Sequence, residues 1–437
     1  MRRSVLLLVL LVGWGALAPP AALAAAFDPE AATEAYLARV PPAQKARSDA
    51  YFEGGYWIQL WSFLIGLALA WLLLGTGLSA RLRDLGERIT RFRPLRVWIY
   101  AVLYTLVTSA LLFPWTAYVD FFREHQYGMA THDFGGWFGD QVKGLLVALV
   151  FMPLLLAALY AVLRRAPRTW WLWGSVVAVA FLIVGVLIAP IWIAPLFNKY
   201  TPLEPGPIRE SILSLAQANG VPADEVYMMD ASRQTKRISA NVSGLAGTTR
   251  VTLNDNLLER TSPPEIEAVM GHELGHYVLN HVYEMIVELG LVILIGFAWL
   301  YFASGRVLAR FGERWRLRGV DDPAGLPLLA ALLAVFFFVL TPINNTIIRV
   351  NEAEADIFGL NASRQPDGFA EVALKLGEYR KLSPGPIEEW VFYDHPSGRN
   401  RILMAMRWKA EEMERQARAA EWLQAVDRSP ARKPSRL

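Results

Sequence analysis

The chain has 437 residues, of which 54% are hydrophobic and 19% are charged, compared with roughly 45–50% and about 25% in an ordinary soluble domain. These proportions exclude a disordered or fibrous chain and predict a membrane protein. The formal net charge of +3 does not indicate a nucleic-acid partner, and the absence of Cys excludes disulfides, thiol catalysis and Cys-ligated metal sites.

Residues 1–26 have the features of a secretory signal peptide. A basic start, Met1-Arg2-Arg3, precedes an apolar run and small residues that end at Ala24-Ala25-Ala26, and this order predicts cleavage near that point. The alternative is an uncleaved first span, because the apolar stretch is nearly long enough to cross a bilayer. In both cases Phe27 begins outside the cytoplasm.

Six further apolar stretches each approach the ~20 residues that a helix needs to cross a bilayer. The predicted spans are Trp57 to Gly77, Val97 to Tyr118, Val142 to Leu163, Trp170 to Pro195, Met285 to Ala303 and Leu326 to Ile348.

Arginine residues are concentrated on alternate connections between these spans. Segments 78–96, 164–169 and 304–325 contain six, three and five Arg, respectively. The positive-inside rule therefore places these three connections in the cytoplasm and the remaining segments on the exported side. The basic tail from Arg407 to Arg436 does not fit, but long terminal segments obey the rule weakly.

The longest polar insertion lies between the fourth and fifth spans and reads as a small α+β unit. A helix is expected at 207–219, and strands near 225–230, 238–242 and 249–253, with Gly244 and Gly247 between the last two. After the last span the chain is expected to be helical to about Leu376, and a charged helix over 402–426 reads as a solvated face.

The predicted fold class is therefore an α-helical multi-pass membrane protein with six spans after a signal peptide, or seven if that segment is uncleaved, plus a small α+β unit. The predicted organisation is 1–26 signal peptide or first span, 27–195 membrane region with four helices, 196–284 α+β unit, 285–348 two further membrane helices, 349–404 acidic helix and the segment after it, and 405–437 charged tail.

The strongest chemical signal is His272-Glu273-Leu274-Gly275-His276. It lies in a helix that Ser262 is expected to cap, with Pro in the first turn and the acids Glu265 and Glu267 near the positive end of the helix dipole. Two His at i and i+4 project from one helix face and can bind a single metal ion, while the adjacent Glu273 can hold a water molecule beside it. The alternative is a pair of packed helix histidines without a metal.

A catalytic zinc ion needs a third protein ligand. The candidates on the same side of the membrane are His281, His395, Glu284 and the acidic residues of segment 351–356. We expect Glu352 to be the ligand. Asp356, on the same helix face, is expected to orient a ligating His or to pair with Arg349. His281 is turned off the ligand face and is expected to line the adjacent groove or to cap a network, and a solvated acidic helix end is the alternative for 351–356.

With these residues in view, the sequence from about Tyr51 to Ile402 resembles the integral-membrane CAAX prenyl protease 1 family of zinc metalloproteases. The matching segments are Glu124 to Gly128, Ala194 to Leu203, His272 to His276 with Asn280-His281, Asn351 to Asp356, and His395-Pro396. The resemblance implies that His272, His276 and Glu352 are the zinc ligands. It also implies that Asn241, on an edge strand, holds the substrate backbone and that His395 stabilises the tetrahedral intermediate.

The resulting hypothesis is a zinc endopeptidase with one Zn²⁺ per chain and Glu273 as general base. Its expected partners are the lipid bilayer and a peptide or membrane-associated protein, with or without a lipid, and no nucleic acid. The Arg pattern places the active site on the exported side of a plasma (inner) membrane. The competing hypotheses are a metal-handling transporter, which the scarcity of ionisable residues in the spans disfavours, and a catalytically inactive quality-control protein.

Overall fold

The computed structural model describes residues 27–243 and 249–428. The predicted signal peptide over 1–26, the glycines Gly244 and Gly247, and the end of the tail over 429–437 lie outside the described residues.

Six helices among the described residues are long and apolar enough to cross a membrane. At most 22% of the most apolar window of any of them is buried, so their apolar side chains face outward, as lipid contact requires. This confirms the predicted six spans, and each helix is longer than the apolar stretch that predicted it. The segments are Pro42–Gly75, Arg93–Gln126, Phe134–Arg165, Trp170–Leu196, His281–Phe311 and Pro323–Ser363.

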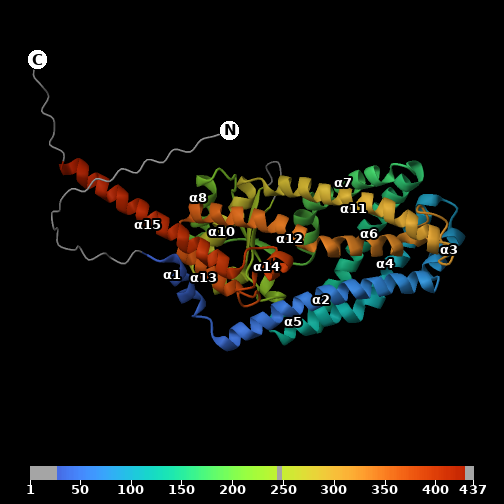
Figure 1. Ribbon diagram of the computed structural model, residues 1–437, viewed down its shortest axis with the longest axis horizontal. Coiled ribbons are helices and arrows are strands. Elements are labelled where there is room, and N and C mark those ends of the chain that lie inside the picture. The colour runs from blue at the N-terminus through green and yellow to red at the C-terminus, as the bar shows by residue number, and fades with distance from the viewer. Residues whose placement is uncertain (1–26, 244–248, 429–437) are drawn as a thin grey trace, which may run out of the picture.

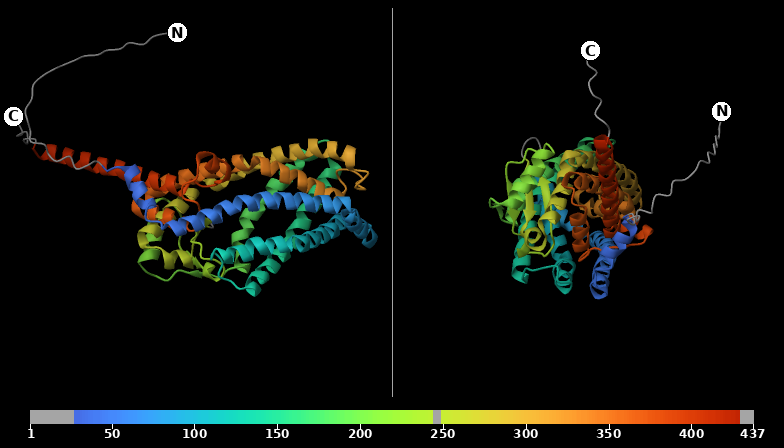
Figure 2. Two further views of the ribbon diagram at one scale, coloured as in Figure 1. Left: turned by 60° about the horizontal axis from the view of Figure 1, so that its bottom comes forward. Right: turned by 90° about the vertical axis from the view of Figure 1, so that its left-hand side faces the viewer.

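The helices form an elongated bundle, with the small sheet and the shorter helices gathered at one end and α3 at the other (Figures 1 and 2). The α-helices are α1 (Pro29–Leu37), α2 (Pro42–Gly75), α3 (Leu78–Ile89), α4 (Arg93–Ala117), α5 (Arg123–Gln126), α6 (Phe134–Arg165), α7 (Trp170–Ile188), α8 (Pro207–Ala218), α9 (Asp255–Arg260), α10 (Pro263–Val278), α11 (His281–Phe311), α12 (Leu326–Ser363), α13 (Pro366–Leu376), α14 (Pro386–Phe392) and α15 (Gly398–Arg428). Short π- or 3₁₀-helical turns are η1 (Tyr118–Phe122), η2 (Ala189–Ile193), η3 (Ala194–Leu196), η4 (Ala231–Arg233) and η5 (Pro323–Gly325).

Four short strands form one sheet in the order β1-β2-β4-β3. The central pair β2–β4 is parallel, and both outer pairs are antiparallel. Apolar side chains of α8, the sheet, α9 and α10 form one core beneath it, including Ile212, Leu253, Ile266 and Met270. The strands are β1 (Tyr200–Pro202), β2 (Val226–Met229), β3 (Ala240–Ser243) and β4 (Arg250–Asn254).

Three of these strands were predicted, and β1 was not. It has three residues and includes Pro202, which is confined to edge positions because it cannot donate a backbone hydrogen bond. Its sequence therefore carries no strand pattern, and only its pairing with β2 defines it.

Two of the quoted sequence motifs connect the membrane helices to the sheet unit. Glu124 accepts hydrogen bonds from Arg237 Nη2 at 2.7 Å and from the Tyr51 hydroxyl at 2.7 Å. Asn198 Nδ2 donates to Gln234 Oε1 at 3.1 Å. These polar contacts fix the position of the sheet unit on the bundle.

The chain beyond Ile348 is helical to Leu376, as expected, but an unexpected break separates α12 from α13. α12 ends at Ser363, Arg364 adopts a left-handed conformation with φ 55°, and α13 starts at Pro366. The physical reason is Pro366, which disfavours helical geometry in the preceding residue and is favoured in the first turn of a new helix, where α13 begins. The charged helix α15 is solvated over its later turns, as expected, but its first turns bury Ile402 and Met406 in a core with α13.

Candidate metal centre

Helix α10 holds the two histidines of the predicted metal site. It begins with a capping box in which Ser262 and Glu265 satisfy each other's backbone groups. The one-turn spacing brings Nε2 of His272 and Nε2 of His276 to 3.1 Å from each other. The helix thus presents both ring nitrogens at one point, as the sequence spacing predicted.

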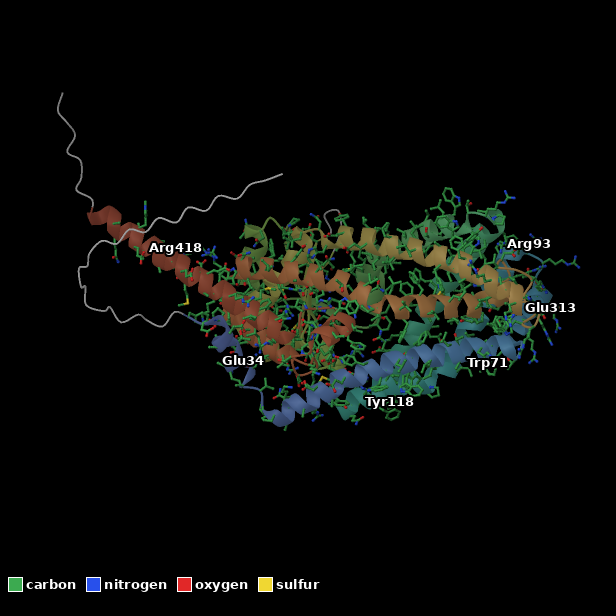
Figure 3. The ribbon with its side chains drawn as sticks, viewed as in Figure 1. Glu34, Trp71, Arg93, Tyr118, Glu313 and Arg418 are labelled. Carbon is green, nitrogen blue, oxygen red and sulfur yellow. The ribbon has the colours of Figure 1, made fainter. Side chains whose placement is uncertain are left out.

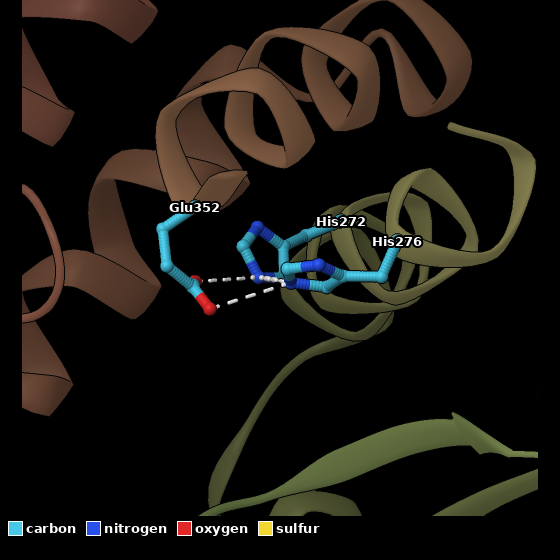
Figure 4. A group of neighbouring side chains, drawn as sticks. All are labelled: His272, His276 and Glu352. Atoms are coloured by element: carbon cyan, nitrogen blue, oxygen red, sulfur yellow. Dashed lines mark hydrogen bonds and ion pairs between the residues drawn. The ribbon is translucent and has the colours of Figure 1, made fainter. Parts of the chain in front are cut away.

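Glu352, from α12, completes this group (Figure 4). Its Oε2 lies 3.2 Å from His272 Nε2, and its Oε1 lies 3.5 Å from His276 Nε2. One ligand atom from each of the three residues lies within 4.8 Å of the other two. The structure therefore brings together the three residues predicted as ligands, although they are up to 80 positions apart in the chain.

The polar atoms of this group fit a bound cation. Glu352 Oε2 is buried and, within the described residues, no hydrogen-bond donor is aligned with it. A buried carboxylate oxygen without a partner carries a desolvation cost. A divalent cation among two imidazole nitrogens and a carboxylate would remove that cost, and this set of N and O donors suits zinc.

Asp356 orients His272 from behind. Its Oδ1 lies 2.8 Å from His272 Nδ1, on the side of the ring opposite the metal-facing nitrogen. The fully buried Asp356 also accepts hydrogen bonds from Arg401 Nε at 2.9 Å and Nη2 at 2.5 Å. Of the two partners considered from the sequence, the structure places His272 at Asp356. Arg349 instead donates to the backbone carbonyls of Glu389 and Tyr393.

His281 plays the network role expected for it. Its Nδ1 lies 2.9 Å from His276 Nδ1, and its Nε2 lies 3.4 Å from Glu354 Oε2. His281 is buried, whereas 55% of the Glu354 side chain is exposed. His281 therefore contacts the outer nitrogen of His276, in the way that Asp356 contacts the outer nitrogen of His272.

Glu273 and His395 line a cavity of about 180 Å³ that adjoins His272. His395 Nε2 lies 3.2 Å from Glu352 Oε2, and its Nδ1 lies 2.8 Å from Asp394 Oδ1. Ser239 and Ala240, at the start of β3, line the same cavity. Glu273 and His395 thus lie in one cavity, next to the start of the edge strand β3.

Asn241 is the second residue of β3, the edge strand. Its side chain is exposed, and its backbone pairs in register with Thr252 of β4 on one side only. This is the edge-strand location expected for it, directly after the cavity-lining Ala240.

The ionisable groups of the centre shift one another's pKa values. Burial alone would lower the pKa of His272, but the adjacent carboxylates of Asp356 and Glu352 outweigh burial and raise it to about 10. Burial and the neighbouring His272 lower the pKa of His276 to about 4. Burial raises the pKa of Glu273 to about 7, which is closer to neutrality than an ordinary Glu.

The sequence analysis missed Arg401, the residue that neutralises Asp356. It lies in the first turn of α15, just before the charged helix predicted over 402–426, and an Arg beside other charged residues carries no periodic signal. Its distance of six residues from His395 was the available clue.

Two family models match the chain in succession. "CAAX prenyl protease N-terminal, five membrane helices" matches residues 25–199, and "Peptidase family M48" matches residues 202–409. The second match contains the whole of the metal centre described above, and the two together span nearly all of the described residues.

The chain belongs to peptidase family M48. It is a membrane metallopeptidase similar to CAAX prenyl protease 1, as the sequence resemblance predicted. The CAAX prenyl protease 1 of Saccharomyces cerevisiae is 26% identical over 305 residues, which cover 66% of this chain and 67% of the relative. A Bacillus subtilis relative named "Uncharacterized metalloprotease YhfN" is 29% identical over 372 residues, which cover 83% of this chain and 86% of the relative.

The M48 fold assignment also rests on a solved structure. The crystal structure of S. mikatae Ste24p matches with a TM-score of 0.69 at 21% sequence identity, covering 86% of this chain and 95% of that chain. The overall fold is therefore shared with that structure.

Proposed function

We propose that this M48 peptidase is a zinc-dependent endopeptidase whose metal ligands are His272, His276 and Glu352. The observation that carries the proposal is the convergence of these three side chains, with one atom of each within 4.8 Å of the others. When bound, zinc would act as a Lewis acid that lowers the pKa of a coordinated water toward ~7.

Glu273 is the general base of the proposed reaction. It is adjacent to His272 in the motif and lines the cavity beside it. Its carboxylate accepts a proton from the attacking water and later delivers it to the leaving amine of the cleaved peptide bond.

His395 and Asn241 handle the substrate. His395 lies across the cavity from α10 and can donate a hydrogen bond to the oxygen on which negative charge develops. Asn241 lies on the edge strand, where an extended peptide can pair as an additional strand. This mode of binding selects unfolded or extended segments over folded domains.

The proposed substrate is a peptide or a membrane-associated protein segment, with or without a lipid. The distribution of Arg over the connections between spans supports an active site on the exported face of the plasma (inner) membrane. The printed names of the relatives, CAAX prenyl protease 1, make lipidated peptides one candidate substrate class, independently of this orientation.

The test is the variant Glu273→Gln in purified protein. Removal of the base is expected to reduce cleavage of an unstructured peptide by roughly 10²–10⁴-fold, while one zinc ion per chain remains bound. A chelator should abolish cleavage by the unmodified protein, and added zinc should restore it. Undiminished turnover in Glu273→Gln would contradict the mechanism, and an inactive unmodified protein with bound zinc would favour the quality-control alternative.

A further inference from the structure

A second polar cavity lies at the end of the bundle opposite the metal centre. It has a volume of about 250 Å³ and is lined by residues of α3, the start of α4, the end of α6, and the segment before α12. Figure 1 shows these elements around α3, and Figure 3 labels Arg93 at this end. Five arginines and three carboxylates line the cavity, which gives it a formal charge of +2.

Two of the five arginines are neutralised within the wall. Arg83 Nη1 lies 2.5 Å from Asp322 Oδ2, and both side chains are buried. Arg318 Nη1 lies 2.6 Å from Glu87 Oε1. These pairs hold α3 against the connection between α11 and α12, so they shape the cavity and add little net charge to it.

The other three arginines have no such partner. Within the described residues, Arg93, Arg96 and Arg164 have no carboxylate oxygen within 4.0 Å, and the one side-chain hydrogen bond among them runs from Arg96 Nε to the Thr90 carbonyl. Asp321 is the remaining carboxylate of the cavity and offsets one of the three charges. Arginines from two different membrane helices therefore line one cavity without enough negative charge there to balance them.

The positive-inside rule by itself explains arginines at this end but not why these three line one cavity. Arg81, Arg88 and Arg91 belong to the same cluster in the sequence, are exposed, and do not line the cavity. Arg93 is exposed, whereas Arg96 and Arg164 are half-buried, and Asp321 alone does not balance the charge of the three, so the cluster carries a desolvation cost. A bound anion would remove this cost.

The position of the cavity indicates which kind of anion would bind there. The three arginine-rich connections, 78–96, 164–169 and 304–325, all lie at this end of the bundle. The cavity therefore lies where the ends of the membrane helices meet lipid headgroups. Beside it, 65% of Phe92 and 43% of Leu95 are exposed, which provides apolar surface next to the charged groups. Arg forms strong, paired hydrogen bonds to phosphate.

From this arrangement we propose that the cavity formed around Arg93, Arg96 and Arg164 binds the phosphate group of an anionic phospholipid. The phosphate contacts the three unpaired guanidinium groups, and the acyl chains lie along the exposed apolar side chains toward the bilayer. Basic pockets between membrane helices bind lipid headgroups by this chemistry. The site is independent of the metal centre and of the proposed peptidase mechanism.

The test measures lipid binding to the purified, delipidated full chain in a neutral detergent. Native mass spectrometry counts bound phosphatidylglycerol and phosphatidylcholine, and thermal unfolding is followed with each lipid and with inorganic phosphate. The cavity variant is Arg93→Ala/Arg96→Ala/Arg164→Ala. The matched control, Arg81→Ala/Arg88→Ala/Arg91→Ala, removes the same charge from the same end of the bundle. A third variant, with Lys at the three cavity positions, keeps the charge if the Ala variant does not fold.

We expect one phosphatidylglycerol per chain to bind at least roughly tenfold more tightly than phosphatidylcholine. The cavity variant should lose this preference, while the control and the Lys variant keep it within a few-fold. Equal losses in the cavity and control variants would overturn the proposal in favour of general surface charge. Stabilisation by inorganic phosphate equal to that by phosphatidylglycerol would overturn the assignment to a lipid. Peptide cleavage, measured at the other end of the molecule, reports whether each variant is folded.

Discussion

The backbones of Gly359 and His272 touch. A Cβ added at Gly359 would lie 2.7 Å from the His272 nitrogen, a separation that real Cβ contacts do not show. Gly359 follows Asp356 by about one helical turn and Glu352 by two, so all three lie on the face of α12 that meets α10. Gly271 and Gly275 make similar close contacts from α10 with Gly359 and Ala355. Because these three glycines have no side chains, α10 and α12 lie close enough for Glu352 and Asp356 to reach the two histidines.

The variant Gly359→Ala should therefore separate the two helices and disrupt the metal centre. The obstructing atoms are backbone and cannot move aside, and overpacking of this kind costs about 1–3 kcal/mol. We expect a lower thermal midpoint and less than one zinc per chain, as measured by elemental analysis. Gly305→Ala in α11 is the control, because a Cβ there has no neighbour within 4 Å. Full zinc content in Gly359→Ala would show that the close contact between α10 and α12 does not set the positions of the ligands.

Asp356→Asn should weaken metal binding without removing a ligand. Asn cannot give His272 the negative partner that Asp356 provides at 2.8 Å, and it leaves the buried Arg401 without a counter-charge. Loss of such an orienting carboxylate typically lowers metal affinity by about 10–100-fold. Competition with a chelator of known affinity measures the change. The control Glu313→Gln, which removes an exposed carboxylate at the far end of the bundle (Figure 3), should stay within a few-fold of the unmodified protein.

His395→Ala should separate catalysis from metal binding. If His395 stabilises developing negative charge, kcat should fall by roughly 10²–10³-fold while zinc content stays at one per chain. His125→Ala provides a control, because that ring contacts the backbone carbonyls of Phe121 and His132, outside the centre. A loss of zinc together with activity would instead make His395 a fourth ligand.

Glu265 should make the helix that bears both histidines more stable at neutral pH than in acid. Burial by itself would raise the pKa of Glu265, but hydrogen bonds from Lys375 and Ser262 outweigh it and hold the pKa below its usual value of 4.5. A carboxyl whose pKa is lower in the folded than in the unfolded state stabilises the fold above the unfolded value, and this contribution is lost as the pH falls through the lower, folded value.

In Glu265→Gln the thermal midpoint should drop at pH 7, by an amount that corresponds to about 0.5–2 kcal/mol. The difference from the unmodified protein should shrink as the pH is lowered below 4.5. The control Glu259→Gln changes an exposed carboxyl outside the capping box and should have no such effect. A difference that does not depend on pH would show that Glu265 acts through its shape and not through its charge.

The local elements of this protein follow directly from its sequence, because each depends on residues that are close together in the chain. The six spans were placed by continuous apolar stretches, and the i, i+4 spacing of His272 and His276 fixed one half of the centre. β1 was not predicted, because only its pairing with β2 defines it. The break at Arg364 was not predicted, because the effect of Pro366 on the preceding residues was not considered.

The sequence by itself determined that the chain crosses a membrane, that its polar unit carries a paired-histidine helix, and that an acidic helix follows the last span. Only the tertiary structure decided that Glu352 meets that pair, that Arg401 and not Arg349 neutralises Asp356, and that Arg93, Arg96 and Arg164 line one cavity at the far end. The physical reason is that charged side chains have no sequence periodicity that identifies a partner 45 or more residues away. Their pairing is selected by helix packing, which here depends on the narrow contact between Gly359 and His272.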